Sequence, residues 1–451
     1  MGGLRARLGV MTDSHWPGTR GARIAWSPGG TTALLAGGLA AAVIIAAFCV
    51  PRAAMTFYGV LGCVALVRYA QLGGAWRDLL RPDPIATPVF LVGLWALVSA
   101  TWSPAPLVSL EAGAIFCGNI LLTWLIARWL ALEPAAHAEA LRRGILIGAA
   151  IGLGLVLFEM LSEQAIRRFL LNAIPVLRPE QMHYLDMKGD TITRIRFHQL
   201  NRHAAVAVLL AWPVLLMTAV WVKAAWRGWL IAGFATVLGA VTFLSWHESS
   251  KLALLASCAV FALTWLNARI AFPLVVAGWI VMTVAVLPVA IVAFESRLYE
   301  ASWIQETGRA RLILWGTTAQ RVLDAPILGI GAGAGRVLDD QVKDRATELP
   351  GQPFALRTGA HQHNIYLQTW YELGALGVLL LTAAGLALLT ALRRQTGVLQ
   401  SYLYAAFTAG AVMAGVSYGL WQAWFQATFG LMAVITMMAM AEQRTGANRD
   451  P

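Results

Sequence analysis

Histidines, an amide and a carboxylate gather in residues 360–377, where a long polar stretch of the chain meets an apolar one. His361, His363 and Asn364 come first, and Glu372 follows. The apolar run indicates a membrane helix, and polar groups at the end of such a helix need a partner or a function. One interpretation is a polar cap at the membrane surface. The other is that the helix N-terminus presents His363 to an anionic substrate, because unpaired N–H groups and the helix dipole attract negative charge.

His361 and His363 could instead bind a metal ion as a pair. The sequence offers no third ligand at a recognisable spacing and no His-Glu-x-x-His motif, so we expect neither a metal nor another cofactor. In a helix that starts at Asn364, Glu372 falls roughly on the face opposite His363. We therefore expect Glu372 to pair with an arginine of a neighbouring helix near the substrate, and not to orient His363.

Two stretches of basic residues could hold a phosphate group. Arg194, Arg196 and Arg202 lie just before an apolar run, with Asn201 between the last two. Arg311 lies near the start of a segment whose apolar residues recur at helical spacing until Pro326, which predicts an amphipathic helix. Guanidinium groups bind phosphate oxygens in pairs, so these arginines could clamp a phosphate. The alternative is a solvated patch that faces lipid headgroups.

Two further features lie near these residues along the chain. Lys251, in the short connection 246–251, is a candidate ligand cation, and an ion pair with Glu248 is its structural alternative. The glycines within residues 327–336 resemble a phosphate-binding loop, but no Lys-Ser/Thr pair follows them and no strand–turn–helix pattern surrounds them. We favour a flexible turn with exposed N–H groups close to the site.

The composition indicates that membrane helices position all of these residues. Of 451 residues, 58% are hydrophobic and 13% are charged, and a soluble domain cannot bury that much apolar surface. The net charge of +11 could indicate nucleic acid, but the basic residues form short clusters between apolar runs, as topology signals do. We therefore expect membrane lipid, and not nucleic acid, as the surrounding partner.

The apolar runs predict an all-α, polytopic integral membrane protein with about twelve transmembrane helices. Each run is of spanning length. The first follows a basic tail and is too long for a signal-peptide core, so we expect an uncleaved anchor. The runs are residues 31–50, 53–72, 85–102, 107–130, 144–161, 204–222, 229–246, 252–266, 273–294, 375–392, 402–420 and 423–440.

The distribution of basic residues predicts the orientation of these helices. Excess Lys and Arg marks the cytoplasmic side of a membrane, and here it falls on the even-numbered connections and on both tails, residues 1–30 and 441–451. Both tails of the transmembrane domain, residues 31–440, are therefore expected in the cytoplasm. Two long connections, residues 162–202 and 295–362, then lie on the far side, the larger one between helices nine and ten.

Three of these stretches resemble the O-antigen ligase and O-antigen polymerase superfamily. One is a His-Asn followed by Leu, Glu and two glycines; another is an arginine followed by Trp and then Pro-x-x-Gly-x-Gly; the third is arginine and an aromatic residue before the Asn that starts a helix. The matching residues are His363, Asn364, Leu367, Glu372, Gly374 and Gly377; Arg311, Trp315, Pro326, Gly329 and Gly331; and Arg194, Arg196, Phe197 and Asn201.

The resemblance implies a GT-C-like glycosyltransferase of the bacterial inner membrane with a large periplasmic loop. Such an enzyme moves a glycan from undecaprenyl diphosphate to an acceptor on the periplasmic face, and for a ligase the acceptor is the core sugar of lipid A. Arginines can meet the charge of a diphosphate leaving group in place of a metal ion and a general acid. The first two outer loops contain no acidic residue, so a histidine is the best remaining base, and direct attack would invert the anomeric centre.

We therefore expect an O-antigen ligase with His363, Arg311 and Arg196 as catalytic residues. An O-antigen polymerase and a protein O-oligosaccharyltransferase are alternatives of the same class. A transporter of anions or glycolipids is the alternative of a different class, although it would place arginines along a path through several helices. The expected substrate-binding residues are Arg194, His361, Asn364, Lys251, Asn201 and Glu372.

Overall fold

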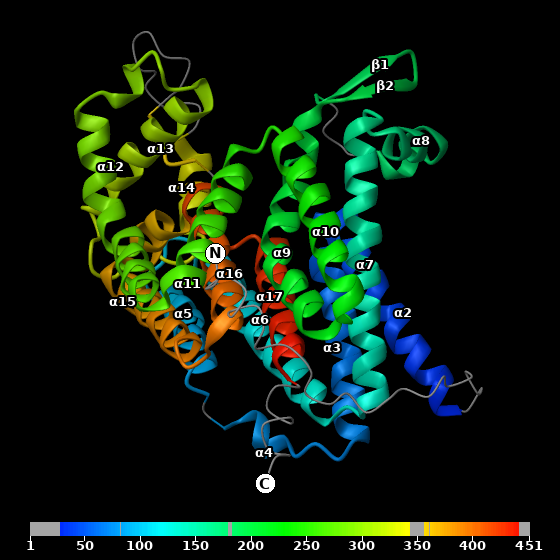
Figure 1. The fold of residues 1–451 in the computed structure, drawn as a ribbon. Helices are drawn as coiled ribbons and strands as arrows, with labels where there is room; N and C mark the ends of the chain where they lie inside the picture. Colours follow the sequence, from blue (N-terminus) through cyan, green and yellow to red (C-terminus); the bar gives the residue numbers. More distant parts are fainter. Residues whose placement is uncertain (1–27, 82, 179–182, 343–355, 360, 442–451) are drawn as a thin grey trace.

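The long helices of the protein run side by side in a bundle, with shorter elements at both ends (Figure 1). Nine helices in the described part of the chain are long and apolar enough to cross a membrane. The chain is therefore an all-α, multi-pass membrane protein, as its sequence predicts. The computed structural model describes residues 28–81, 83–178, 183–342, 356–359 and 361–441, so the expected tails lie almost wholly outside it.

Each of the twelve expected segments coincides with helical structure, although several boundaries differ. The helices are α2 (Pro28–Cys49), α3 (Ala54–Gln71), α4 (Trp76–Leu79), α5 (Ala86–Val98), α6 (Pro106–Leu132), α7 (Ala135–Leu161), α8 (Ala165–Ala173), α9 (Asn201–Trp221), α10 (Ala224–Leu244), α11 (Glu248–Ile280), α12 (Val286–Glu295), α13 (Glu306–Val322), α14 (Ala334–Val342), α15 (Ile365–Leu392), α16 (Gly397–Val416) and α17 (Ala423–Met440), and the strands are β1 (Leu185–Lys188) and β2 (Thr191–Ile195).

Two of the expected segments are joined in one helical stretch of 48 residues, Glu248–Glu295. At 1.5 Å per residue this stretch is roughly 70 Å long, more than twice the hydrocarbon thickness of a bilayer. It is interrupted at Asn267, whose φ of −154° is not helical. The Asn267 side chain accepts hydrogen bonds from the N–H groups of Arg269 and Ile270, so it caps the second half. The connection expected near Arg269 is therefore a capped kink.

Helix α9 is the centre of the bundle. Fifteen consecutive residues, Ala204–Thr218, are buried, so the helix is covered on all sides. It packs against α7, α10, α11, α16 and α17. A helix that is apolar around its whole circumference is stable only when it is surrounded. The first turn of α9, which carries Asn201 and Arg202, is thereby fixed relative to the neighbouring helices.

Helices α2 and α7 pack closely because glycines line their contact. Gly144, Gly148 and Gly152 recur every fourth residue on α7, and a Cβ atom at Gly144 would lie 2.0 Å from the carbonyl oxygen of Gly37 on α2. Small residues at this spacing let helix backbones approach each other in a membrane. The packing of α2 against α7 holds the last turn of α2, with Phe48, beside Gly152 of α7.

The two long connections lie at the same end of the bundle, opposite the described ends of the chain (Figure 1). The first contains α8 and an antiparallel hairpin, in which Asp186 of β1 pairs with Arg194 of β2. A small apolar core that includes Leu171, Tyr184 and Ile192 packs α8 against this hairpin. The second connection contains α13 and α14, and α13 is the amphipathic helix that the sequence predicts.

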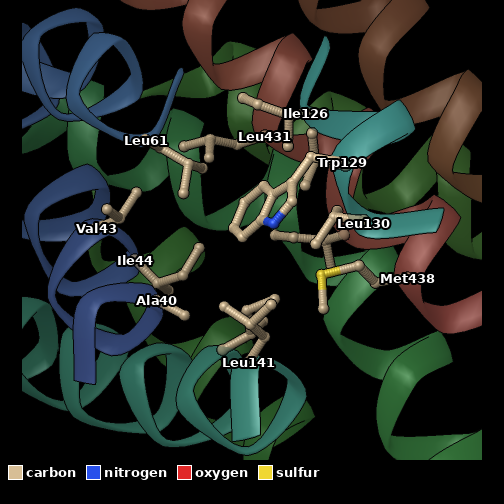
Figure 2. A pocket seen from close by; sticks show the side chains of 13 residues that line it. Ala40, Val43, Ile44, Leu61, Ile126, Trp129, Leu130, Leu141, Leu431 and Met438 are labelled. Atoms are coloured by element: carbon tan, nitrogen blue, oxygen red, sulfur yellow. The ribbon is translucent and has the colours of Figure 1, made fainter. Parts of the chain in front are cut away.

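An apolar cavity lies between α2, α3, α6, α7 and α17. Figure 2 shows the apolar side chains that line it, with the indole ring of Trp129 among them. The nitrogen of that indole donates to Glu133. Since the lining residues carry no group suited to chemistry, we place the functional site elsewhere.

Helix α15 is broken at Gly374, where the glycine-rich stretch crosses it. Gly374 has φ 65° and ψ −169°, a conformation open almost only to glycine. The N–H of Gly331 donates to the carbonyl oxygen of Glu372 (2.8 Å), and the N–H of Ala375 donates to that of Pro326 (2.9 Å). A Cβ atom at Gly329 would lie 2.4 Å from the backbone of Glu372. The glycines therefore allow two backbones to meet, and the flexible turn expected from the sequence is wrong.

We predict that Gly374→Ala destabilises the protein by roughly 1–3 kcal/mol, because an alanine at this φ and ψ is strained. In addition, a Cβ atom at Gly374 would lie 2.3 Å from the carbonyl oxygen of Ile327. The measurement is the apparent melting temperature of purified protein in detergent. Gly154→Ala on α7 is the matched control, since nothing lies within 4 Å of a Cβ there. Equal melting temperatures for the two variants would contradict the prediction.

Candidate active site

Two histidines meet at the connection between α16 and α17. Nδ1 of His363 lies 2.6 Å from the carbonyl oxygen of Ser417, and Nε2 of His247 lies 2.9 Å from the hydroxyl of the same serine. A carbonyl oxygen can only accept, so Nδ1 of His363 carries the proton and Nε2 keeps its lone pair. The sequence predicts a helix through Leu420, but α16 ends at Val416. At this break, the carbonyl oxygen of Ser417 orients the ring of His363, and the hydroxyl of Ser417 orients the ring of His247.

The loop that carries His363 is held from α13. Trp315 of α13 donates from its indole nitrogen to the carbonyl oxygen of Gln362, at 2.7 Å. His363 itself has φ 52°, a left-handed conformation that is uncommon for residues other than glycine. The next residue, Asn364, caps α15 by accepting from the N–H of Leu367 at 3.0 Å. Asn364 therefore fixes the position of His363.

Burial keeps the histidines of this site neutral. The pKa of His363 is lowered to about 4, mainly by burial and then by electrostatic interaction with His361 and Arg311, against the opposing contact with Ser417. Burial also lowers the pKa of His247 to about 3, with further contributions from Arg311 and His363. The pKa of His361 is lowered too, again mainly by burial. A neutral imidazole with a free Nε2 is a suitable general base at pH 7.

Arg311 brings a positive charge to these histidines. It acts electrostatically on His247, His363 and Tyr418. Burial lowers the pKa of Arg311, whereas Tyr418 raises it. In the part of the chain that the structure describes, Arg311 forms no ion pair. A partly buried guanidinium without a counterion is suited to binding an anion.

We call Arg311, His247, His361, His363 and Tyr418 the histidine–arginine cluster. The ring centres of His361 and His363 are 4.2 Å apart, in an edge-to-face arrangement. The ring centre of Tyr418 lies 5.5 Å from that of His247. Among the described residues no group of three or more His, Cys, Asp or Glu side chains could hold a metal ion. The chemistry that the cluster itself offers is that of a base next to a cation.

Two of the expected arginines are not among the groups that act electrostatically on His363. Arg194 and Arg196 are exposed, on and just after β2, and Arg196 acts electrostatically on His198. Lys251 forms an ion pair with Glu248 at 2.8 Å, as expected if Lys251 is not a ligand cation. Asn201, which follows Arg196 in the same basic run, is the first residue of α9. Its Oδ1 is buried without a hydrogen-bond partner among the described residues.

Glu372 binds protein groups and not the expected arginine. It is 1% exposed, and its carboxylate accepts from the N–H of Gly333 (2.8 Å), from Gln368 (3.2 Å) and from the indole of Trp421. Within the described residues no arginine forms an ion pair with it. The expected arginine pair is therefore not formed by the residues that the structure describes, and Glu372 fastens the glycine-rich stretch to α15.

Sequence reasoning missed His247, Ser417 and Tyr418, and it included Arg202 only as a member of the basic run before α9. Arg202 acts electrostatically on His247, His361 and Tyr418. The available signals were weak: Arg202 follows Asn201 directly within a basic run, and His247 lies in the same short connection as Lys251. Ser417 and Tyr418 could not be recognised, because the apolar run continues through them.

The comparisons with known proteins agree with this arrangement. Residues 243–382 match the family model described as O-antigen ligase. Over 340 residues the chain is 23% identical to the exopolysaccharide production protein ExoQ of Rhizobium meliloti (strain 1021), covering 73% of this chain and 68% of that protein. The matched segment includes Arg311, His363 and Glu372. The match of residues 243–382 to this family model confirms the resemblance found in the sequence.

Proposed function

We propose that the protein is an O-antigen ligase, which transfers O-antigen glycan from undecaprenyl diphosphate to the core sugar of lipid A. The observation that carries the proposal is the neutral His363, with Nε2 free, beside the unpaired Arg311 within the segment that matches the family. Glycan transfer from a diphosphate needs a base for the acceptor hydroxyl and positive charge for the leaving group. The cluster offers both.

In the proposed reaction, Nε2 of His363 takes the proton of the acceptor hydroxyl while its oxygen attacks the anomeric carbon of the donor sugar. The bond between that carbon and the diphosphate oxygen breaks, and the diphosphate leaves with the electron pair. Arg311 stabilises its charge, with Arg196 as a second phosphate contact, so that no metal ion is required. Attack from the side opposite the leaving group inverts the anomeric centre. The carbonyl oxygen of Ser417 stabilises the imidazolium that forms.

The other expected residues act at the edge of the site in this proposal. Arg194, Asn201 and Lys251 contact the glycan or the acceptor, and His361 lies against the ring of His363. Asn364 and Glu372 act through the loop and the helix that they hold. The distribution of basic residues supports a cytoplasmic location for residues 1–30 and 441–451, and a periplasmic one for residues 162–202 and 295–362. The active site then faces the periplasm of a bacterial inner membrane.

An O-antigen polymerase is the second candidate, because one relative is an exopolysaccharide production protein. Purified protein is incubated with undecaprenyl diphosphate-linked glycan, with and without lipid A-core. Glycan joined to lipid A-core supports the ligase, whereas longer glycan on the carrier supports the polymerase. If neither product forms and the glycolipid instead crosses the membrane of vesicles that contain the protein, the enzyme class is wrong.

His363→Ala should lower the rate of glycan transfer by about a hundred- to ten-thousand-fold, the typical contribution of a general base. Binding of undecaprenyl diphosphate should remain, because arginines hold the diphosphate. His361→Ala is the matched control and should cost less, since the ring of His361 lies beside the base. The reverse ranking would assign the base to His361. Equal losses of binding and turnover in His363→Ala would make the residue a phosphate ligand.

Arg311→Lys should be strongly impaired in turnover although it keeps the charge. A lysine cannot form the paired hydrogen bonds of a guanidinium, and these bonds fix the leaving group. We expect a loss of at least about tenfold, equivalent to roughly 1.4 kcal/mol of transition-state stabilisation. Arg321→Lys, on the exposed end of the same helix, serves as the control for folding and membrane insertion. Wild-type turnover of Arg311→Lys would place Arg311 outside the site.

The rate should depend little on pH between 5.5 and 7.5. The pKa of His363 in the free protein is about 4 instead of 6.5, so the imidazole is neutral throughout this range and gains a proton only as the pH falls toward 4. A base with the ordinary pKa would lose about tenfold in kcat/KM at pH 5.5. The kcat/KM for donor is measured across this range, with donor affinity measured in parallel. A tenfold loss at unchanged affinity would exclude a buried His363 as the base.

A further inference from the structure

Three arginines from distant parts of the chain act electrostatically on one another, and one of them, Arg202, also acts on the histidine–arginine cluster. Arg52 lies in the turn between α2 and α3, Arg167 in the first turn of α8, and Arg202 in the first turn of α9. Arg52 acts electrostatically on both other arginines, and Arg167 acts on Arg202. The function proposed above uses none of them. We call these three residues the arginine triad.

Specific contacts hold the elements of the triad together. Nε2 of His203, beside Arg202, donates to the carbonyl oxygen of Cys49 at 3.0 Å, so the end of α2 is fixed against α9. The side chain of Gln164, just before α8, is fully buried and donates to the carbonyl oxygen of Ile195 at 3.0 Å. The convergence of the three arginines is therefore built into the fold.

The protein groups that the structure describes compensate the positive charges of the triad only in part. Within the described residues none of the three arginines forms an ion pair, and Nε of Arg202 is buried without a hydrogen-bond partner. Glu159 is close enough to act on Arg167. However, its two carboxylate oxygens accept from the N–H groups of Ile166 (2.8 Å) and Arg167 (3.3 Å).

Like charges in partly buried surroundings raise the free energy of the folded protein unless an anion joins them. The pKa of Arg167 shows this effect, because burial lowers it and the charge of Arg52 lowers it further, against Tyr184 and Glu159. Guanidinium groups that approach one another from separate elements match the several oxygens of a phosphate. The chemistry of the triad is thus that of a phosphate site.

The surroundings of the triad indicate that the phosphate belongs to a lipid. Helix α8 exposes Phe169 and Leu170, at 69% and 41% of their surface, beside the end of a helix of spanning length, Ala135–Leu161. A short helix with exposed apolar side chains next to basic ones is typical of the boundary between lipid and water. A lipid headgroup at this boundary would bring its phosphate to Arg167 and Arg52.

We propose that Arg52, Arg167 and Arg202 bind a phosphate group of an anionic lipid, at a site adjacent to that of Arg311 and His363. Arg202 links the two sites, since it also acts electrostatically on His247, His361 and Tyr418. The identity of the lipid rests on the proposed function: it is the donor, held by its diphosphate, or the acceptor, held by a phosphate of lipid A. Binding itself is tested without turnover.

The test measures the affinity of purified protein for single lipids in detergent. The probes are undecaprenyl diphosphate, lipid A, dephosphorylated lipid A and phosphatidylglycerol. We compare wild type with Arg202→Gln and with the double variant Arg52→Gln/Arg167→Gln. Arg297→Gln is the control, because this arginine is exposed in the other long connection. Thermal melting shows that each variant is folded, and the exposed Arg52→Gln alone replaces any variant that is not.

We expect the triad variants to bind at least one phosphate-bearing lipid at least tenfold more weakly than wild type, and the control within twofold. Dephosphorylated lipid A should bind wild type and variants equally. A loss confined to undecaprenyl diphosphate identifies the donor, a loss confined to lipid A identifies the acceptor, and equal losses that include phosphatidylglycerol indicate a general headgroup site. Unchanged affinity for every phosphorylated lipid in the folded variants would overturn the proposal. If the variants lose affinity but wild type forms neither ligase nor polymerase product, the proposed function fails and the triad stands.

Discussion

Backbone groups inside a membrane must find hydrogen-bond partners within the protein, and the site of this protein exists where helices break and meet that requirement. Lipid offers no donors or acceptors, so a broken helix is tolerated only where other protein groups replace its hydrogen bonds. The break in α15 at Gly374 is satisfied by the stretch from Pro326 to Gly331. Side chains from the start of α15 and the loop before it bind the backbone groups that are left free after α16. The N–H of Leu420 donates to Gln368 at 2.8 Å, and the carbonyl oxygen of Ser417 accepts from His363. The same contacts that repair the backbone thus orient the candidate base.

Hydropathy and helical periodicity were enough to predict the helices, because the physical cause acts along the chain itself. A run of apolar residues long enough to span a bilayer must be covered by lipid or by other helices. The amphipathic helix that carries Arg311 was predicted for the same reason. The end of α16 could not be predicted, since residues 417–420 are as compatible with a helix as those before them. What ends the helix is a set of contacts from α15 and α11, which only the fold brings together.

The candidate site was predicted in part, and the errors have a common origin. His363 and Arg311 are brought together, and the match to the family covers both. Within the basic run from Arg194 to His203, however, the sequence does not show which arginine faces the helices. The hairpin leaves Arg194 and Arg196 exposed, whereas the start of α9 turns Arg202 toward His247, His361 and Tyr418. The role of Glu372 was also missed, because its partners are backbone and indole N–H groups far along the chain.

Three carboxylates near the site accept hydrogen bonds from backbone N–H groups, and among the described residues none of them forms an ion pair with Arg311 or with the arginine triad. Glu372 accepts from the backbone of Gly333, Glu159 from that of α8, and Asp339 from the backbone of Gly359 as well as from Arg357. Each carboxylate thus stabilises an irregular segment by accepting from N–H groups that no helix would satisfy. Among the described residues, Arg167 of α8, Arg202 of α9 and Arg311 of α13 therefore keep their positive charge without an ion-pair partner. An electropositive site at the boundary of the membrane attracts anionic substrates and suppresses their competitors. The architecture that holds the loops in place is, in this way, also the origin of the field that would bind a lipid diphosphate.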